Sequence, residues 1–164
     1  MFHRSGRNRG EIVRPPPQVR LGGLPSLVVV NNDLPAKNLQ EFVAYAKANP
    51  AKLNYGAASS SQRIASETFG SVAGIKMTYV PYKIGQAAVV EAMSGIIQVF
   101  RGDVGITVSE AKAGKIRALA VTRKMRTPML PELLTVGEAL GQQGFEVVAW
   151  FGAFAPKGTS RAVI

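Results

Sequence analysis

The sequence predicts an α/β domain with a mixed, mostly parallel sheet flanked by helices. Strand-sized apolar runs alternate with helix-sized amphipathic runs, the connections between them are short, and 46% of the 164 residues are hydrophobic. Such alternation is typical of parallel or mixed sheets with helices on both faces. A chain of this length and composition suits one packed domain.

The first residues, 1–16, do not fit this pattern and are expected to form a separate basic tail. Residues 1–20 contain five arginines and one glutamate, and three consecutive prolines occupy positions 15–17. The basic start is not followed by the apolar segment of about 7–15 residues that a signal peptide needs. His3, the only histidine, lies in this tail. We expect it to be solvated rather than catalytic, because a catalytic base must be held in a fixed geometry.

Residues 25–31 predict a buried strand, since a β-branched run of this kind is typical of a central position in a parallel sheet. The next segment predicts a helix that begins at Asn38, with Glu41 three residues later as in a capping box. Its apolar residues recur at helical spacing, at positions 39, 42, 43 and 46.

A short strand at 53–55 leads into a second helix, which is expected to begin near Gln62. Its predicted buried face consists of Ile64, Ala65, Thr68, Phe69 and Val72. The alternation then continues to the end of the chain. It predicts strands at 77–80, 96–100 and 116–121, helices at 87–93, 109–112 and 136–140, and a turn at 102–105, and it ends in a mixed apolar run at 147–154.

The stretch 55–63 joins a strand to a helix and is the first candidate for a binding site. Three consecutive hydroxyl residues, Ser59, Ser60 and Ser61, follow a Gly-Ala-Ala step where the helix should begin. The first N–H groups of a helix lack internal partners and carry partial positive charge, which suits a carboxylate or a phosphate. An ordinary helix cap at Ser60 or Ser61 fits the same residues, and the local sequence leaves both interpretations open.

Two further segments, 81–85 and 102–105, also follow predicted strands. Ligands of open α/β sheets bind at the carboxyl ends of strands, so the three segments could converge on one cleft. Asp103 is the only acid among them, and a lone acid there favours a turn residue or helix cap over a general base. Lys83 could meet a carboxylate or be an ordinary solvated lysine.

The composition favours binding over catalysis, with no metal and no cofactor expected. The sequence has no cysteine, which excludes disulfides, thiolate metal sites and cysteine nucleophiles. It has neither nucleotide-binding glycine motif and no Gly-x-Ser-x-Gly elbow. The net charge of +10 would favour anionic small molecules. Nucleic acid is not expected as a partner of the domain, because its basic residues are scattered rather than clustered.

Six motifs lie in a characteristic order along the chain. They are Leu-Val-Val-Val-Asn at 27–31, Leu-Pro-Ala at 34–36, Lys-Leu-Asn-Tyr at 52–55, Val-Pro-Tyr-Lys at 80–83, Ala-Gly-Lys-Ile-Arg-Ala-Leu-Ala-Val-Thr at 113–122 and Trp-Phe-Gly-Ala-Phe-Ala-Pro-Lys-Gly-Thr at 150–159. Their order and spacing resemble the Bug-type (TctC-like) solute receptors of tripartite tricarboxylate transporters. The resemblance runs from about residue 19 to residue 159.

The resemblance implies a periplasmic clamshell of the type II binding-protein kind, which carries carboxylated metabolites to the membrane components of its transporter. In such receptors the turn after Leu-Asn-Tyr holds a ligand carboxylate with backbone amides and hydroxyls. Two departures from the family pattern stand out, because Ile84 replaces a small residue and Arg101 adds charge near the cleft. The ligand-binding residues that the resemblance implies are Tyr55, Gly56, Ala57, Ser59, Ser60, Ser61, Pro81, Tyr82, Lys83 and Asp103.

The chain is short for a whole receptor of this kind. The resemblance implies hinge and partial first-domain residues at 17–32, a ligand-binding second domain at 33–148 and a truncated return strand at 149–164, with the first domain largely missing. With half of the site missing, we expect the chain to bind ligand weakly or not at all. We also expect apolar hinge surface around Val28, Val30 and Trp150 to favour self-association.

The alternative function is a basic interaction module, in which the arginine-rich tail binds nucleic acid or an anionic surface. Binding of that kind weakens steeply with salt and depends on residues 1–16.

Overall fold

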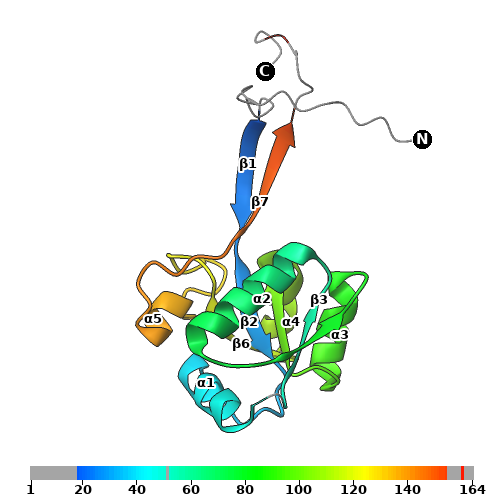
Figure 1. The fold of residues 1–164 in the computed structure, drawn as a ribbon, viewed down its shortest axis with the longest axis vertical. Coiled ribbons are helices and arrows are strands. Elements are labelled where there is room, and N and C mark those ends of the chain that lie inside the picture. Colours follow the sequence, from blue (N-terminus) through cyan, green and yellow to red (C-terminus); the bar gives the residue numbers. More distant parts are fainter. Residues whose placement is uncertain (1–17, 51, 155–159, 161–164) are drawn as a thin grey trace, which may run out of the picture. The chain divides into compact units, whose positions relative to one another are not determined.

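The computed structural model describes residues 18–50, 52–154 and 160, so the predicted tail lies outside the described part. The chain forms two compact units. The larger spans Gly23–Ala149 and contains all the described helices and the larger sheet (Figure 1). Strands β1 (Gln18–Leu24) and β7 (Ala149–Phe154) pair in a separate two-stranded sheet. The domain boundaries predicted after residues 32 and 148 stay predictions.

The larger sheet has five strands in the order β4-β3-β5-β2-β6. β3 is parallel to β4 and β5, whereas β2 is antiparallel to both of its neighbours, β5 and β6. Four strands therefore run in one direction and β2 runs against them, which confirms the predicted mixed, mostly parallel sheet. The strands are β2 (Ser26–Val30), β3 (Asn54–Ala57), β4 (Thr78–Pro81), β5 (Val99–Asp103) and β6 (Arg117–Val121).

The prediction of a parallel position for β2 is wrong, although its burial is as expected. All five of its residues are buried, and it lies between β5 and β6. A continuous apolar run indicates that both faces of a strand are covered. It contains no information about direction, which depends on how the chain enters and leaves the sheet.

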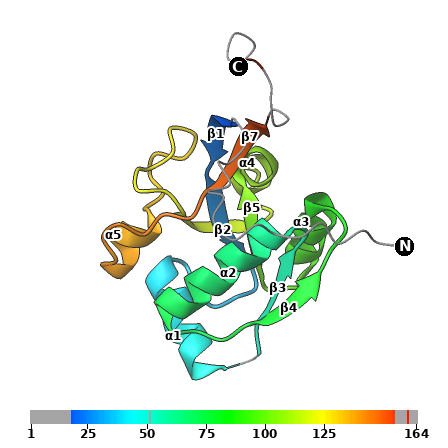
Figure 2. The same ribbon diagram turned by 45° about the horizontal axis from the view of Figure 1, so that its top comes forward.

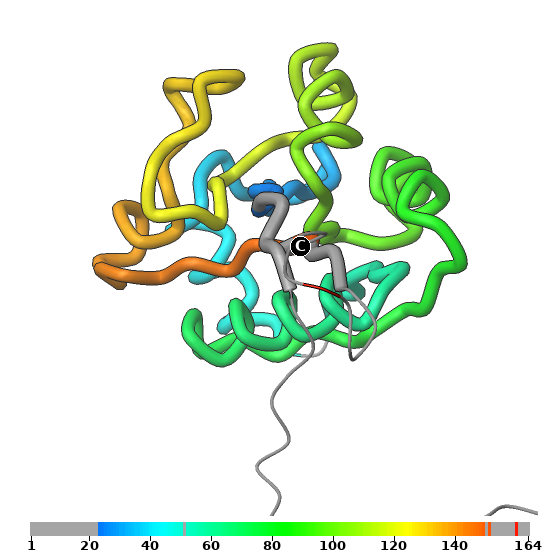
Figure 3. Tube along the Cα trace, turned by 90° about the horizontal axis from the view of Figure 1, so that it is seen from above, coloured from blue at the N-terminus to red at the C-terminus, as the bar shows by residue number. Residues whose placement is uncertain are grey.

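Helices cover both faces of this sheet (Figure 2). Alternate residues of β2 separate two apolar cores, because successive side chains of a strand point to opposite faces. Val28 and Val30 pack in the core that contains residues of α1, α2 and α5, whereas Leu27 and Val29 pack in the core that contains residues of α3 and α4. Figure 3 accordingly has α2 and α4 on opposite sides of the sheet. The helices are α1 (Leu39–Ala48), α2 (Ser60–Ala73), α3 (Gly85–Ser94), α4 (Val104–Lys112) and α5 (Val136–Leu140).

The predicted cap of α1 is confirmed. The side chain of Asn38 accepts a hydrogen bond from the Glu41 backbone N–H at 2.9 Å. The Glu41 carboxylate accepts in return from the Lys37 backbone N–H at 2.7 Å, one residue earlier than in a standard capping box.

The predicted buried face of α2 is partly wrong. Ala65 and Phe69 are buried as expected, but Ile64 is 64% exposed and Val72 is 38% exposed. Apart from Phe69, the residues of α2 that face the core are small or polar. A search for large apolar residues therefore selects the wrong face of the helix. The buried residues are Gln62, Ala65, Ser66, Phe69, Gly70 and Ala73.

The turn predicted at 102–105 does not exist. β5 passes directly into α4 at Asp103–Val104, so the helix begins five residues earlier than Ser109. Gly102 suggested a turn, but its role is close packing. A Cβ at this position would lie 2.4 Å from both Phe100 Cε1 and Thr107 Cγ2.

The expectation of an exposed apolar hinge is wrong for two of its three residues. Val28 is 1% exposed and Val30 is fully buried, because both face the core under α1 and α2. The side chain of Trp150 lies outside the described part of the chain. Neither valine can therefore supply a surface for self-association.

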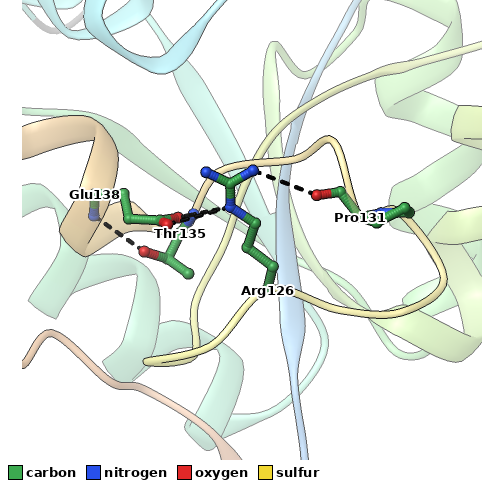
Figure 4. A network of polar contacts seen from close by, with 4 residues as sticks. All are labelled: Arg126, Pro131, Thr135 and Glu138. Carbon is green, nitrogen blue, oxygen red and sulfur yellow. Dashed lines mark hydrogen bonds and ion pairs between the residues drawn. The ribbon is translucent and has the colours of Figure 1, made fainter.

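A polar network fastens the loop before α5 to that helix (Figure 4). Thr135 and Glu138 form a capping box, with bonds of 3.0 Å and 2.7 Å between the side chain of each and the backbone N–H of the other. Arg126 donates to both carboxylate oxygens of Glu138 at 3.2 Å and to the Pro131 carbonyl at 3.4 Å.

No helix in the described residues is long and apolar enough to cross a lipid bilayer.

Candidate ligand-binding site

Three strand-to-helix junctions lie at one edge of the sheet. β3, β4 and β5 are parallel, so the junctions that lead into α2, α3 and α4 follow the same edge. The first turns of these helices are also close together. A Cβ on Gly85, the first residue of α3, would lie 3.1 Å from Ile106 Cδ1 of α4 and 3.8 Å from Gln62 Nε2 of α2. The edge therefore gathers three helix N-termini, where anions are stabilised.

The first turn of α2 is capped by Ser59. Its hydroxyl oxygen accepts from the Gln62 backbone N–H at 3.2 Å, so the prediction that Ser60 or Ser61 is the cap is wrong. The Ser59 and Ser61 hydroxyls are 2.9 Å apart, and all three serines are exposed. Capping leaves the backbone N–H groups of Ser60 and Ser61 without a partner inside the helix. Two backbone donors and three hydroxyl groups thus occupy one short exposed segment.

Strand β3 contributes its backbone rather than its side chains to this edge. Tyr55 is 1% exposed, and its hydroxyl donates to Glu67 Oε1 at 2.6 Å in the middle of α2. Burial, and secondarily the Glu67 carboxylate, raise the pKa of Tyr55. Ala57 is fully buried. A Cβ on Gly56 would lie 2.6 Å from Ile97 Cδ1 and 2.9 Å from Tyr82 Cε2, so side chains already cover this glycine.

The junction after β4 presents an uncapped helix. Pro81 and Lys83 are exposed, and Tyr82 is half-buried. The Tyr82 hydroxyl donates to the Glu91 carboxylate of α3, and burial together with this carboxylate raises the pKa of Tyr82 to about 12. Ile84 is the N-cap of α3, has no side-chain cap hydrogen bond and is 62% exposed. The N-terminus of α3 therefore keeps its donors available beside an apolar side chain.

The junction after β5 contains one acid and one base. Asp103 is half-buried, and its Oδ1 accepts from the Ser26 hydroxyl at 3.3 Å. It is the N-cap of α4, as the sequence allowed, but its side chain makes no cap hydrogen bond. Arg101 is only 4% exposed, and its Nη2 donates to the Ser61 carbonyl of α2 at 3.4 Å. Burial lowers the pKa of Arg101 to about 10, and the negative charge of Asp103 opposes this shift.

Arg101 lies at this junction but is absent from the list of sequence-predicted site residues. The sequence places an arginine before Gly102, but it does not indicate that the strand turns this side chain under α2. Residues 99, 101 and 103 alternate to one face of β5, and Val99 belongs to the core that α2 covers. A charged residue at a position whose neighbours predict a buried strand is the signal that could have identified it.

The donors gathered at this edge suit an anion. The described residues contain no group of three or more His, Cys, Asp or Glu side chains that could bind a metal ion. Backbone N–H groups, serine hydroxyls and a guanidinium are donors, and together they favour an oxyanion.

A family profile described as "Tripartite tricarboxylate transporter family receptor" matches residues 17–164. The chain belongs to this receptor family. A protein from the tcbD-tcbE intergenic region of Pseudomonas sp. strain P51 is 36% identical over 150 residues, which cover 90% of this receptor chain and 45% of the relative. BugT of Bordetella pertussis is 29% identical over 150 residues, covering 90% and 46% of the two chains. The receptor chain thus spans about half the length of the curated relatives it matches.

Solved structures of similar proteins also match most of this chain and about half of their own length. An R. palustris protein with adipate is 31% identical with a TM-score of 0.80, and the match covers 90% of this chain and 50% of the other. MatC from Rhodopseudomonas palustris with bound malate is 27% identical with a TM-score of 0.77, covering 86% and 48%. The periplasmic binding protein BugD is 29% identical with a TM-score of 0.78, covering 91% and 50%. These similarities confirm the predicted fold class and the solute-binding family.

Proposed function

We propose that this receptor chain carries one wall of a binding site for a small carboxylate, at the N-terminus of α2. The observation that best supports this proposal is the exposed first turn of that helix, where three serines and two backbone N–H groups are available beside the N-terminus of α3. A carboxylate placed there accepts hydrogen bonds and meets the positive end of the helix dipole. The adipate and malate bound by similar receptors belong to this chemical class.

The binding surface would act together with parts that the longer relatives contain. Closure of a clamshell around a ligand excludes water and strengthens its polar contacts. The receptor would work in the periplasm and deliver its ligand to the membrane components of a tripartite tricarboxylate transporter. An open wall leaves the ligand solvated, so the 164-residue chain should bind with a Kd on the order of 1 mM, about −4 kcal/mol.

The proposal is tested by titrating the ¹⁵N-labelled chain with adipate and malate at constant ionic strength. The backbone N–H resonances of Ser59, Ser60 and Ser61 should shift and saturate at millimolar concentration. Adipamide, which has the same carbon skeleton without charge, should leave them unchanged. Shifts confined to other regions, or none up to about 100 mM adipate, would contradict the assignment of the site. Micromolar affinity would contradict the idea that this chain supplies only one wall.

A further inference from the structure

Arg101 is a buried cation that lacks the partners such a group needs. Its side chain is 4% exposed, and in the described part of the chain Nε and Nη1 are buried without a hydrogen-bond partner. The Nη2 contact with the Ser61 carbonyl, at 3.4 Å, is long for a hydrogen bond. A guanidinium stays protonated in proteins, so a full positive charge is held here with one weak acceptor.

Within the described residues, no acid neutralises this charge directly. No ion pair joins Arg101 to any described carboxylate, and the nearby Asp103 directs an oxygen to the Ser26 hydroxyl instead. Burying a charge without a partner is unfavourable, and proteins tolerate such groups mainly where function uses them. The bond to Ser61 places the guanidinium beneath the first turn of α2, the same turn whose serines form the proposed carboxylate site.

We propose that Arg101 is a specificity-determining residue of this site: its guanidinium pairs with the ligand carboxylate at the first turn of α2, so that the receptor selects ionised acids over their uncharged analogues. The inference rests on the proposed function and adds a side-chain cation to a site otherwise built from neutral donors. An arginine offers two parallel N–H donors to a carboxylate, and charge-assisted bonds are about twice as strong as neutral ones.

The proposal also explains why an unfavourable residue sits in a strand. The guanidinium is poised beside the helix terminus, and a small rotation of its flexible side chain would bring a free donor to an anion bound on Ser60 and Ser61. Ligand binding would then supply the missing acceptor. In the ligand-free chain the buried guanidinium stays without one, which is unfavourable. Arg101 should therefore lower the stability of the ligand-free chain and raise its affinity for anions.

The test compares wild type with R101M, R101K and K112M. Lys112 is exposed in the last turn of α4, and K112M removes one positive charge without touching the site. Adipate affinity is measured from the Ser60 and Ser61 backbone resonances, and ligand-free stability from urea unfolding. We expect R101M to weaken adipate binding by about tenfold or more, R101K to recover part of the loss, and K112M to bind within about twofold of wild type.

A second readout uses wild type alone and does not depend on any variant folding. The Arg101 Nε–H resonance should shift with the same adipate dependence as the Ser60 and Ser61 backbone resonances, and adipamide should not move it. Ligand-free R101M should be at least as stable as wild type, since methionine removes a buried charge while keeping much of the volume.

The outcomes separate the two claims. If the serine resonances report adipate binding but Arg101 Nε–H stays still and R101M binds normally, the inference is overturned and the proposed function stands. If R101M binds adipate normally but is less stable than wild type, Arg101 is a structural residue that supports the first turn of α2, and the inference is again overturned. If adipate leaves the serine resonances unchanged in wild type, the proposed function fails and the inference fails with it.

Discussion

Glu138 shows how one exposed carboxylate can link two segments of this fold. The Thr135 backbone N–H and the Arg126 guanidinium both donate to it (Figure 4), and the pKa of Glu138 is lowered by Thr135 first and Arg126 second. Because the pKa is lower in the folded chain, this group stabilises the fold above its unfolded-state pKa of about 4.3. The contribution is lost as the pH falls through the lowered value.

We therefore expect E138Q to flatten part of the acid dependence of unfolding. Wild type should lose stability on acidification below the ordinary glutamate range, and E138Q should lose less over the same interval. Urea unfolding followed by circular dichroism across the acidic range measures the difference. E132Q, in the exposed part of the same loop, is the matched control for losing one negative charge. Identical pH profiles for E138Q and wild type would show that the network contributes nothing to acid stability.

Two glycines on either side of the β5–α4 junction give a second residue-scale prediction. G102A introduces a methyl group 2.4 Å from Phe100 and Thr107 atoms, so it should destabilise the fold by about 1–3 kcal/mol. G105A meets nothing within 4 Å inside α4 and should stabilise by up to about 1 kcal/mol. The two free energies of unfolding are compared by urea titration. Equal effects of the two substitutions would contradict the packing role of Gly102.

The glycines also show which part of the site the sequence could not specify. The resemblance implies Gly56 as a ligand-binding residue, and the structure fills the space beside it with Ile97 and Tyr82. A glycine can make room either for a ligand or for a neighbouring side chain, and the local sequence does not distinguish the two. The sequence does place three hydroxyl groups at the start of a helix, because their position depends only on neighbouring residues. The orientation of Arg101 depends on strand register, which the local sequence does not show.

At the scale of elements, different serines at the N-terminus of α2 serve capping and the proposed ligand binding. Ser59 caps the helix, so S59A should lower the free energy of unfolding by about 1 kcal/mol. Among the described residues the side chain of Ser60 makes no hydrogen bond, so S60A should change stability by less than about 0.5 kcal/mol. Urea unfolding of both variants checks the assignment. A larger loss in S60A than in S59A would make Ser60, one of the two caps that the sequence allows, the residue that caps α2.

The sequence predicted helix ends where a local capping residue sets them. It did not predict features that depend on tertiary packing. Asn38 marks the start of α1 as expected, and Gly74 ends α2 in the left-handed conformation, because caps depend on a few neighbouring residues. The direction of β2 and the core-facing side of α2 depend on partners far away in the chain. Small residues such as Ser66 and Gly70 face the sheet there, and their apolar signal is too weak to show it.

At the scale of the whole chain, the net charge of +10 permits two kinds of anionic partner. The residues proposed to bind a carboxylate lie between positions 55 and 103 in the larger compact unit, whereas the arginine cluster lies within residues 1–20. The two functions therefore depend on different parts of the sequence. Phosphate binding by the tail should fall steeply with salt, because cations are released from the nucleic acid as the protein binds.

Deleting residues 1–16 separates these functions in one experiment. We expect the shortened chain to bind adipate with the same millimolar affinity as the full chain, since Ser59, Ser60, Ser61 and Arg101 are all retained. Any binding of a DNA oligonucleotide should be lost with the tail, and in the full chain it should fall by at least about tenfold between 50 and 200 mM salt. Adipate is followed by the Ser60 and Ser61 resonances, and DNA by fluorescence anisotropy. Loss of adipate binding on deletion would mean that the tail, rather than the first turn of α2, supplies the charge that attracts the ligand.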